Sequence, residues 1–508
     1  MKVFTTSQIA IIDKYTIENE PIKSIDLMER AASNLACEIR NYIHDEFENL
    51  VFICGHGNNG GDGLAIARKL HKLRMVNIKV YLFAQEDKLS DDCAKNWKRL
   101  KKIKKLEKYI TFNPDDVTID ENSCVIDALF GNGLTRPLGE PYKTLIKKIN
   151  NSGARIISID NPSGLMGEDN SNNDTDAIVK ADKVFTIEFP KLSFFFPENE
   201  DYVKDFDIVS ISLNEKIKNE LESPYYYIYY DSIIKPLLRK RRKFAEKRDF
   251  GHALLIAGSY EKPGCAILAA KACLRSGVGL LHVHIPKNCI LPVISNLPDV
   301  MLSIDNNDNY FTSVSIDNMF TAVGIGPGIG TEVETVKAFN KVLENVKEKN
   351  LHLIIDADGL NILSKNKELL NILPKNTILT PHSREFDRLF GIHDTHYKRF
   401  LTAREVSNKY GIIIVLKGAH TQIHTPEGYT YFNSTGTPAM AKAGTGDVLT
   451  GIILSFLAQK YNPVDAAILG VYFHGLAGEE AKIIYSKGYK ESEYSILASD
   501  IIDNIFIR

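Results

Sequence analysis

Apolar, β-branched runs alternate with amphipathic stretches along the first half of the chain. The runs predict strands, and the stretches between them, whose apolar positions recur at helical spacing, predict helices. Ser24 and Ser90 are the predicted N-caps, each followed by an acidic residue in the first turn. This alternation predicts an α/β fold in which a parallel sheet carries helices on both faces. The expected strands are Leu50–Cys54, Ile78–Phe83, Cys124–Ala128, Arg155–Ile159 and Lys183–Ile187, and the expected helices are Ser24–Ile43, Gly61–Leu73 and Ser90–Leu106.

The same alternation resumes near residue 250 and predicts a second α/β domain. We therefore expect a first domain at 1–220, a connection at 221–248 and a second domain at 249–508. The expected strands of the second domain are Ala253–Ala257, Leu280–Ile285, Thr321–Ile325, Leu351–Ile355 and Ile412–Leu416. Its expected helices are Cys265–Ser276, Thr331–Glu344, Thr402–Tyr410 and Gly446–Leu457.

The connection 221–248 contains the string YYYIYY and the basic run RKRRK at 239–243. We interpret the basic run as a solvated linker face rather than a nucleic-acid patch. We interpret the tyrosines as an edge strand or linker packing rather than a base-stacking platform.

Composition narrows the function classes. The 508 residues are 44% hydrophobic and 25% charged, and the formal net charge is -2, so no global field recruits nucleic acid or membrane. Seven cysteines form no C-x-x-C pair, which favours reduced thiols over a disulfide framework or a zinc site. The N-terminal apolar run Ile9–Ile12 is too short for a signal peptide, and no apolar run reaches membrane-spanning length. We therefore expect a cytoplasmic protein.

A glycine- and asparagine-rich string, CGHGNNGGDG, follows the strand that ends at Cys54. In open α/β sheets, ligands bind at the carboxyl ends of strands, where glycines allow close backbone approach and a helix N-terminus attracts phosphate. A short G-x-G turn is often purely structural. The longer string adds two amides and a carboxylate that a simple turn does not need.

Two further strand ends carry an aspartate, Asp127 in VIDALFGNGLTRPL and Asp160 in ISIDNPSGL. Either aspartate alone could be a turn or helix cap. Three polar loops at neighbouring strand ends should instead converge on one crevice. The side chains of Asn59, Asp127 and Ser163 offer only oxygen ligands, which suit a hard cation rather than zinc.

These loops resemble the N-terminal epimerase domain of the NAD(P)H-hydrate repair family, which has a Rossmann-like doubly wound sheet. The resemblance implies that potassium is bound by Asn59, Asp127 and Ser163 and that Asp160 performs the proton chemistry. This chain has Asn161 where the family usually has an aliphatic residue. The implied contacts to the hydrated cofactor are Asn58, Asn59, Gly60, Gly61, Asp62, Gly131, Asn132, Gly133, Leu134, Thr135, Arg136, Pro137 and Asp160.

The second domain has its own glycine-rich string, AKAGTGDVLTG, which contains Gly444–Asp447. Backbone donors at this helix start suit an anion, and Asp447 could accept a proton from a hydroxyl that attacks a phosphoryl group. The alternative is that Asp447 only complements the helix dipole. G-x-G-D in this setting resembles the ribokinase-like superfamily.

Further segments, among them AGSYEKPGCA, GIGPGIG, DADGLN, TPHSRE and KGAHT, narrow the resemblance to the ADP-dependent dehydratase domain of the same repair family. This implies that the domain dehydrates the S epimer of the hydrate with magnesium and ADP, giving NAD(P)H, AMP and phosphate. The implied ADP contacts are Lys417, Gly418, Ala419, His420, Thr421 and Gly446. The implied hydrate contacts are Ala266, Gly328, His382 and Asp447.

Single residues of this set also have structural explanations. His382 could satisfy a loop carbonyl, and Gly328 could only shape a turn. Ser383 and Arg384 replace the usual Pro-Gly after the histidine, and Gly436–Ala441 departs from the usual Gly-Asn-Pro-Gly-Met-Ala. These departures leave the fine substrate geometry open.

Two other functions remain compatible with the motifs. A small-molecule kinase for a vitamin or sugar would share the GTGD string, and it would release a stable phosphorylated product. A binding module is the second alternative, because domains resembling the first half serve assembly in RNA-decapping scaffolds. The presence of Asp160 and of the potassium-type ligands favours the enzyme. We expect the hydrates of NADH and NADPH and ADP as the only partners, without nucleic acid or membrane, and leave a homo-oligomer open.

Overall fold

The computed structural model describes residues 1–44, 47, 49–73, 75, 77–485 and 494–507. The chain forms two compact units, Lys2–Ser223 and Pro224–Arg508, the second of which also includes Met1. Each unit contains a sheet of parallel or mostly parallel strands with helices on both faces, so the predicted α/β class is confirmed.

The sheet of the N-terminal unit has the order β4-β3-β2-β5-β6-β7-β8, and every neighbouring pair is parallel. The central strands are apolar on both faces because helices cover both. The strands are β2 (Asn49–Cys54), β3 (Ile78–Phe83), β4 (Glu107–Thr111), β5 (Ser123–Ala128), β6 (Arg155–Ile159), β7 (Lys183–Ile187) and β8 (Phe206–Val209), and the short β1 (Lys2–Val3) precedes them.

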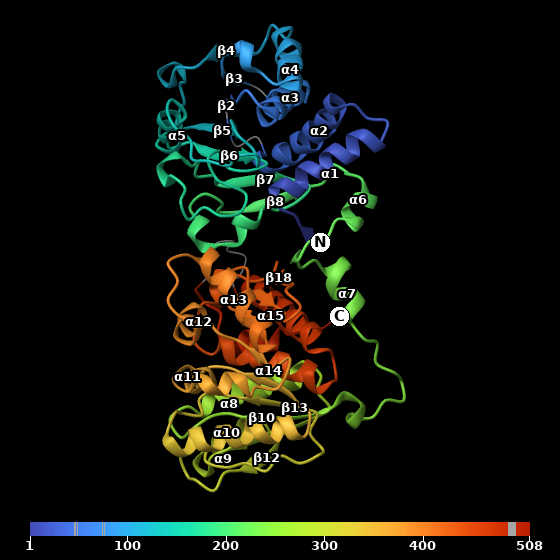
Figure 1. Ribbon diagram of the computed structural model, residues 1–508, viewed down its shortest axis with the longest axis vertical. Helices are drawn as coiled ribbons and strands as arrows, with labels where there is room; N and C mark the ends of the chain where they lie inside the picture. Colours follow the sequence, from blue (N-terminus) through green and yellow to red (C-terminus); the bar gives the residue numbers. More distant parts are fainter. Residues whose placement is uncertain (45–46, 48, 74, 76, 486–493, 508) are drawn as a thin grey trace. The chain divides into compact units, whose positions relative to one another are not determined.

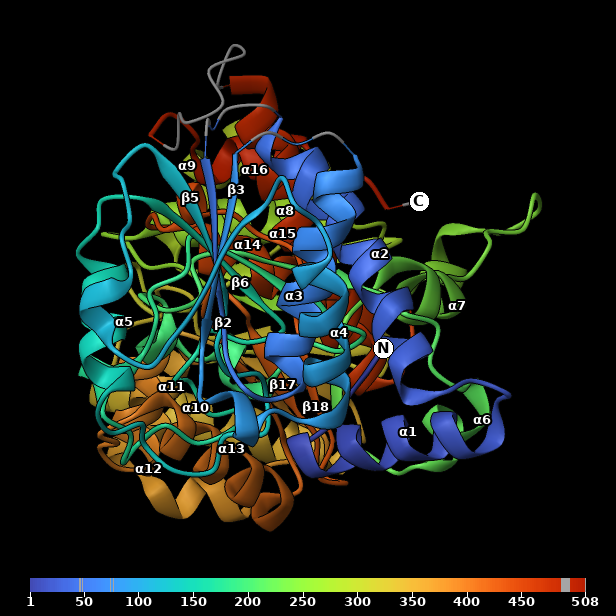
Figure 2. The same ribbon diagram turned by 90° about the horizontal axis from the view of Figure 1, so that it is seen from above.

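Helices α2 (Ser24–Ile43), α3 (Asn58–Lys72) and α4 (Asp91–Lys101) lie side by side over one face of this sheet, and α5 (Tyr142–Asn150) covers the other (Figures 1 and 2). Residues of β2 divide accordingly: Phe52 and Cys54 join the core under α2–α4, whereas Val51 and Ile53 join the core under α5. Two further helices, α1 (Thr6–Asn19) and α6 (Glu215–Glu220), pack against each other.

The helix ends predicted in this unit are partly confirmed. The bounds Ser24–Ile43 are those of α2, whereas the helix predicted at Ser90–Leu106 ends at Lys101. The helix predicted from Gly61 begins at Asn58, so most of the glycine-rich string forms the first turns of α3. Gly57 provides the extended N-cap and no side chain caps the helix. Ser24 lies inside α2 behind the N-cap Lys23, whereas Ser90 caps α4 as predicted, since its hydroxyl accepts from the Cys93 N–H.

The sheet of the C-terminal unit has the order β9-β18-β17-β16-β15-β14-β13-β10-β11-β12. Its pairs are parallel except β16–β17 and β17–β18, which are antiparallel. The strands are β9 (Tyr225–Tyr227), β10 (His252–Ile256), β11 (Leu280–Ile285), β12 (Met301–Ile304), β13 (Ala322–Ile325), β14 (His352–Ile355), β15 (Ile378–Leu379), β16 (Ile413–Leu416), β17 (Gln422–His424) and β18 (Thr430–Phe432).

Two hydrophobic cores lie on the two faces of this second sheet. One core holds helices α8 (Pro263–Arg275), α9 (Ile290–Asn296), α14 (Thr445–Ala458), α15 (Pro463–Tyr485) and α16 (Ala498–Asp503). The other holds α10 (Val333–Glu348), α11 (Asp358–Lys365), α12 (Ser383–Phe390) and α13 (His396–Tyr410). The buried helix α14 packs most closely on α8 (Figure 1).

The predicted connection 221–248 differs from the structure. Its tyrosines form β9, which pairs with β18, and the ring of Tyr226 stacks on that of Tyr431 with centroids 5.0 Å apart. The chain therefore enters the second unit at Pro224, and the short helix α7 (Lys235–Leu237) lies beyond that boundary. Among the described residues, no helix has the length and apolarity needed to span a bilayer.

Candidate active sites

A cavity of about 540 Å³ opens at the carboxyl ends of the strands in the N-terminal unit. The start of α3, the loop after β5, the end of β6 and helix α1 form its walls. It brings together many of the predicted hydrate contacts: Asn58, Asn59, Asp62, Gly131, Asn132, Gly133, Leu134, Thr135, Arg136 and Asp160. The predicted contacts Gly60, Gly61 and Pro137 do not line it.

Asp160 is held in a defined orientation inside this cavity. Its backbone has φ +67°, an unfavourable value for a residue other than glycine, and its side chain is buried. The Oδ1 atom accepts hydrogen bonds from Lys191 Nζ at 2.6 Å and from the Ile187 N–H at 3.2 Å. Oδ2 accepts from the Asn132 N–H at 3.3 Å. The carboxyl group is thereby held by the end of β7 and by two loops.

The glycine at position 131 lets this loop approach Asp160. A Cβ atom there would lie 3.1 Å from Asp160 Oδ2 and 3.3 Å from Asn59 Cβ. A larger residue would therefore push the loop away from the carboxyl group. Close packing of Gly131 explains why the G-N-G string follows β5.

The predicted potassium ligands have unequal surroundings. Asp127 is buried and accepts four hydrogen bonds, from the Leu129 N–H, the Ser158 hydroxyl, and the N–H and hydroxyl of Ser163. Burial raises the pKa of Asp127, and the Ser163 donors oppose that shift. Asn59 is buried too, but neither polar atom of its side chain has a partner among the described residues. A buried amide oxygen that lacks a hydrogen-bond donor is suited to bind a cation.

Sequence reasoning missed the only side-chain cation that pairs with Asp160 in the described part of the chain. Lys191 is 1% exposed, and its ammonium also donates to Thr186 Oγ1 at 2.8 Å and to the Phe189 carbonyl at 3.1 Å. All three ammonium protons are therefore used. The string F-P-K at 189–191 after a predicted strand was the available signal, but a lysine in a loop ordinarily points into solvent.

Asp13 of α1 was also missed, and it lines the cavity together with Asp62. Burial, followed by repulsion from Asp160, raises the pKa of Asp13 to about 6. The same two causes hold the pKa of Asp62 well above its usual range. The cavity therefore combines an ion-paired aspartate with two aspartates whose pKa values are raised.

Asn161, which follows Asp160, is buried. The family that the sequence resembles usually carries an aliphatic residue at this position. The Asn161 amide donates to the Leu165 carbonyl at 2.5 Å, while its Oδ1 has no partner among the described residues. Asn161 therefore helps to close the turn after Asp160.

In the C-terminal unit, Asp447 lies in the first turn of α14, behind the left-handed N-cap Gly444. No side chain caps this helix, so its first N–H groups are available to an anion. Burial, and then repulsion from Asp356, raises the pKa of Asp447 to about 7. A carboxyl group with that pKa can take up a proton at neutral pH.

Asp356, which follows β14, links Lys417 to α14. Its Oδ1 accepts from Lys417 Nζ at 3.1 Å, and its Oδ2 accepts from the Thr450 hydroxyl at 2.8 Å. Lys417 also lies 3.8 Å from Glu385. Asp356 belongs to the DADGLN motif but was not predicted as a site residue; its position directly after a buried strand was the available signal.

His382 begins α12 and is its N-cap. Its Nδ1 accepts from the Arg384 N–H at 3.1 Å, and the Glu385 carboxylate accepts from the His382 N–H at 2.9 Å. His382 also forms a β-bridge with Lys417. Its side chain is 47% exposed, so the imidazole can both cap the helix and meet a ligand. Burial lowers the pKa of His382, which favours the neutral ring.

Gly328 and Ala266 lie next to Cys265, by contact and in sequence, respectively. A Cβ on Gly328, which has φ +67°, would lie 3.2 Å from Cys265 Sγ. Cys265 neighbours Asp447, and burial followed by that carboxylate raises the pKa of its thiol to about 12. Ala266 is fully buried in α8. The structure thus connects Gly328 to Asp447 through Cys265.

The predicted ADP loop Lys417–Thr421 is a tight turn after β16. The Thr421 hydroxyl donates to the Gly418 carbonyl at 2.9 Å and accepts from the Gly418 N–H. Ala419 is exposed, and His420 contacts the Asn433 carbonyl at 3.1 Å. Of the residues in this loop, Lys417 alone is hydrogen-bonded to the Asp356 carboxylate. The same Lys417 Nζ would lie 3.4 Å from a Cβ atom on Gly446.

Neither site resembles a zinc centre. Among the described residues, no group of three His, Cys, Asp or Glu side chains is arranged to hold a metal ion. Both sites offer oxygen donors instead, which fit potassium or magnesium.

Comparison with known families divides the chain in the same two parts. The model described as NAD(P)H-hydrate dehydratase matches residues 253–502, and the model described as YjeF-related protein N-terminus matches residues 24–193. The two matched segments contain Asp447 and Asp160, respectively.

Similar proteins extend over almost the whole chain. The bifunctional NAD(P)H-hydrate repair enzyme Nnr of Dictyoglomus turgidum is 31% identical over 99% of this chain and 97% of its own length. The enzyme of the same name from Thermofilum pendens is 32% identical over 95% and 92%. A crystal structure of the ADP/ATP-dependent NAD(P)H-hydrate dehydratase from Bacillus subtilis, co-crystallised with ATP/Mg²⁺, is 30% identical with a TM-score of 0.45, covering 54% of this chain and 93% of that chain.

Proposed function

Because this chain belongs to the family of bifunctional NAD(P)H-hydrate repair enzymes, we propose that it returns hydrated NADH and NADPH to the working cofactors. An epimerase activity interconverts the two C6 hydrates, and a dehydratase activity removes water from the S epimer. We assign the epimerase to Lys2–Ser223 and the dehydratase to Pro224–Arg508. The observation that carries this assignment is one aspartate at a polar site in each unit, the buried Asp160 and the half-buried Asp447.

In the epimerase site, Asp160 moves a proton at the C6 oxygen while the lone pair of the substrate's ring nitrogen helps the C6–O bond to open and reclose. Lys191 and the Asn132 N–H hold the carboxyl group in place. The segments Asn58–Asp62 and Gly131–Pro137 bind the hydrate and orient it, which lowers the entropy cost of the reaction.

Potassium fits this site through the Asn59 amide oxygen, which has no partner among the described residues. Asp127 and Ser163 would complete the ligand set by exchanging some of their mutual hydrogen bonds. The ion would position the bound cofactor rather than react. We expect an Asn59→Ala variant to need a higher potassium concentration for half-maximal epimerisation; an unchanged potassium dependence would contradict this ligand.

In the dehydratase site, Asp447 takes the proton of the C6 hydroxyl, and that oxygen accepts the terminal phosphoryl group of ADP. The C6–O bond then breaks as the ring nitrogen donates its lone pair, phosphate leaves, and loss of a C5 proton restores the C5=C6 bond. The N–H groups at the start of α14 stabilise the charge of the transferring group. The products are NAD(P)H, AMP and phosphate.

The nucleotide lies, in this proposal, on the Lys417–Thr421 turn and Gly446, with the hydrate against Ala266, Gly328, His382 and Asp447. Magnesium would arrive with the nucleotide and neutralise phosphate charge. The carboxylate oxygens of Asp356 and Asp447 are of the donor type that magnesium accepts, so the residues present fit the ion.

The deciding experiment mixes the purified protein with both epimers of hydrated NADH, magnesium and ADP, and follows the near-ultraviolet absorbance of the reduced nicotinamide. A parallel reaction contains ATP. Full recovery from both epimers supports both activities and identifies the nucleotide. Recovery from the S epimer alone leaves the N-terminal unit as a binding module. No recovery with either nucleotide would reject the proposal and favour a small-molecule kinase.

A further inference from the structure

Asp13 stands out among the polar groups of the N-terminal cavity because the proposed reaction leaves it unused. It lines the cavity from α1, an element that carries none of the predicted site residues. In the described part of the chain, no side chain forms an ion pair or hydrogen bond with its carboxyl group. An unpaired carboxyl group that borders a ligand cavity is a candidate for contact with the ligand.

The electrostatic surroundings of Asp13 and Asp160 differ. Lys191 pairs with Asp160 at 2.6 Å and faces Asp13 only from a greater distance. The charged groups that act on Asp13 are Asp160, Lys191 and Glu188, and burial is the largest influence. Asp62 is the other carboxyl group that faces it. The pKa of Asp13 is raised to about 6, so this carboxyl group keeps its proton to a higher pH than an ordinary aspartate does.

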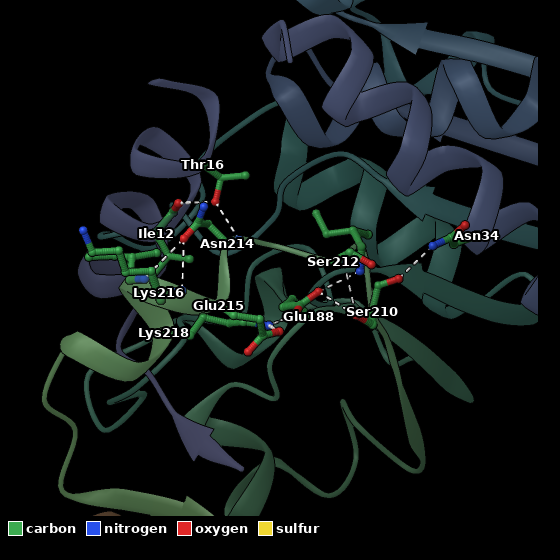
Figure 3. A network of polar contacts seen from close by, with 12 residues as sticks. Ile12, Thr16, Asn34, Glu188, Ser210, Ser212, Asn214, Glu215, Lys216 and Lys218 are labelled. Carbon is green, nitrogen blue, oxygen red and sulfur yellow. Dashed lines mark hydrogen bonds and ion pairs between the residues drawn. The ribbon is translucent and has the colours of Figure 1, made fainter. Parts of the chain in front are cut away.

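A network of polar contacts fixes α1, and hence Asp13, against the cavity (Figure 3). One turn after Asp13, the Thr16 hydroxyl donates to the Ile12 carbonyl at 2.8 Å and accepts from the Asn214 N–H at 3.1 Å. At the other end of α1, the Thr6 N–H donates to Glu168 Oε1 at 2.6 Å. The helix is therefore anchored on both sides of Asp13.

The same network balances the charge of Glu188, which faces Asp13. Glu188 is buried, and its carboxylate pairs with Lys218 at 2.8 Å and accepts from the Ile211 N–H at 2.7 Å (Figure 3). Lys218 belongs to α6, whose N-cap is Asn214, the residue that holds Thr16. The start of α6 thus anchors the C-terminal half of α1, and Lys218 of the same helix neutralises Glu188.

Building on the proposed epimerase function, we propose that Asp13 is a second catalytic carboxyl group, which donates a proton to the C6 hydroxyl while Asp160 accepts one. Epimerisation requires both transfers. The Asp13 proton goes to the C6 hydroxyl, the C6–O bond breaks, the ring nitrogen lone pair forms the C6=N bond, and water leaves. Water then adds to the other face of C6, the C=N electron pair returns to nitrogen, and Asp160 takes the proton of that water. Proton exchange with solvent restores both carboxyl groups.

The test compares Asp13→Asn, which keeps the shape of the side chain but cannot donate an acidic proton, with the intact chain. We expect kcat for epimerisation to fall by about 10²-fold or more, the usual contribution of a general acid. KM for the R epimer should change little, and dehydration of the S epimer by the same molecule should be unchanged. Asp13→Glu should recover part of the lost kcat, because it retains a carboxyl group.

Asp26→Asn is the matched control, since Asp26 is an exposed aspartate of α2 outside the cavity. It should leave epimerisation unchanged. Wild-type kcat in Asp13→Asn, a rise in KM alone, or equal kcat in Asp13→Asn and Asp13→Glu would each overturn the proton-donor role. Failure of the intact chain to epimerise would instead reject the proposed function, so that measurement comes first.

Discussion

Asp160 and Asp447 are the same residue type in opposite surroundings. Asp160 pairs with the buried Lys191 and accepts two backbone N–H bonds. Asp447 forms no ion pair among the described residues; burial and the nearby Asp356 raise its pKa to about 7. A carboxyl group held by a cation is oriented strongly, whereas one left without a cation is a better base near neutral pH. The proposed N-terminal site therefore depends on the orientation of the Asp160 carboxyl group, whereas the proposed C-terminal site depends on the basicity of Asp447.

The largest effect should come from removing Asp447, the proposed base of the C-terminal site. Asp447→Asn cannot accept the proton of the C6 hydroxyl, so dehydration of the S epimer should fall by about 10³-fold or more. Epimerisation should continue, because we assign it to the other unit. Phosphate release and interconversion of the epimers can be measured in the same sample. Equal loss of both activities would contradict two independent sites.

A second large effect should follow from removing the cation of the N-terminal site. Lys191→Met leaves the Asp160 carboxylate buried without its partner, and breaking such a pair costs about 3 kcal/mol of unfolding free energy. Epimerisation should fall by about 10²-fold because the carboxyl group loses its fixed orientation. Denaturant unfolding and epimer interconversion measure the two consequences.

Lys183→Met is the control that distinguishes a loss of stability from a loss of activity in that experiment. Lys183 is also buried, with its ammonium 2.5 Å from Asp205 and 2.8 Å from Asp207, but it does not line the cavity. The Lys183→Met variant should be less stable than the intact chain, while its folded fraction should epimerise the hydrate at the normal rate. If Lys183→Met and Lys191→Met lost epimerisation equally per folded molecule, Lys191 would be a structural residue only.

The pH dependence of dehydration tests whether the raised pKa of Asp447 governs the reaction. The proposed base Asp447 would act in its deprotonated form, and its pKa is raised to about 7, so kcat should fall as pH falls through about 7. Each further unit of pH lowers the active fraction about tenfold. Asp356→Asn removes a negative charge beside Asp447 and should move this decrease to lower pH. A profile of kcat against pH for both proteins tests the shift; identical profiles would show that Asp356 does not tune the base.

The strands and the fold class could be predicted because buried parallel strands are continuous apolar runs. Ile78–Phe83, Arg155–Ile159 and Lys183–Ile187 were predicted with the bounds that the structure has. The start of α3 was misplaced, because glycine and asparagine disfavour helix in isolation and only the packing of Gly60 and Gly61 against neighbouring segments explains their presence.

The polar residues of the site were harder to predict when they came from outside the strand-end loops. Asp127 and Asp160 follow apolar runs, and that position is itself a signal. Asp13 and Lys191 lie in a helix and in a loop whose local sequences look like ordinary solvent-facing segments. Their roles depend on long-range packing, since Asn214 holds α1 and Lys191 crosses 31 positions to Asp160. A pattern confined to neighbouring residues does not contain that information.

The smallest expected effect distinguishes the two roles of His382. As the N-cap of α12 it accepts from the Arg384 N–H, and as a predicted hydrate contact it presents a half-exposed ring. His382→Ala loses both roles, so it should cost about 1 kcal/mol of unfolding free energy and weaken hydrate binding. His382→Asn restores a good cap without the imidazole.

Comparing His382→Ala with His382→Asn therefore distinguishes the contact of the imidazole with the hydrate from its role as the N-cap of α12. We expect His382→Asn to unfold at the same denaturant concentration as the intact chain while its KM for the S epimer rises about tenfold, the equivalent of one lost hydrogen bond. Steady-state kinetics and denaturant unfolding, measured on the same preparations, give both numbers. If KM stayed at the wild-type value in His382→Asn and rose only in His382→Ala, the histidine would serve α12 alone. The hydrate would then be held by Gly328, Ala266 and Asp447, and the C-terminal site would depend on backbone packing more than the N-terminal site does.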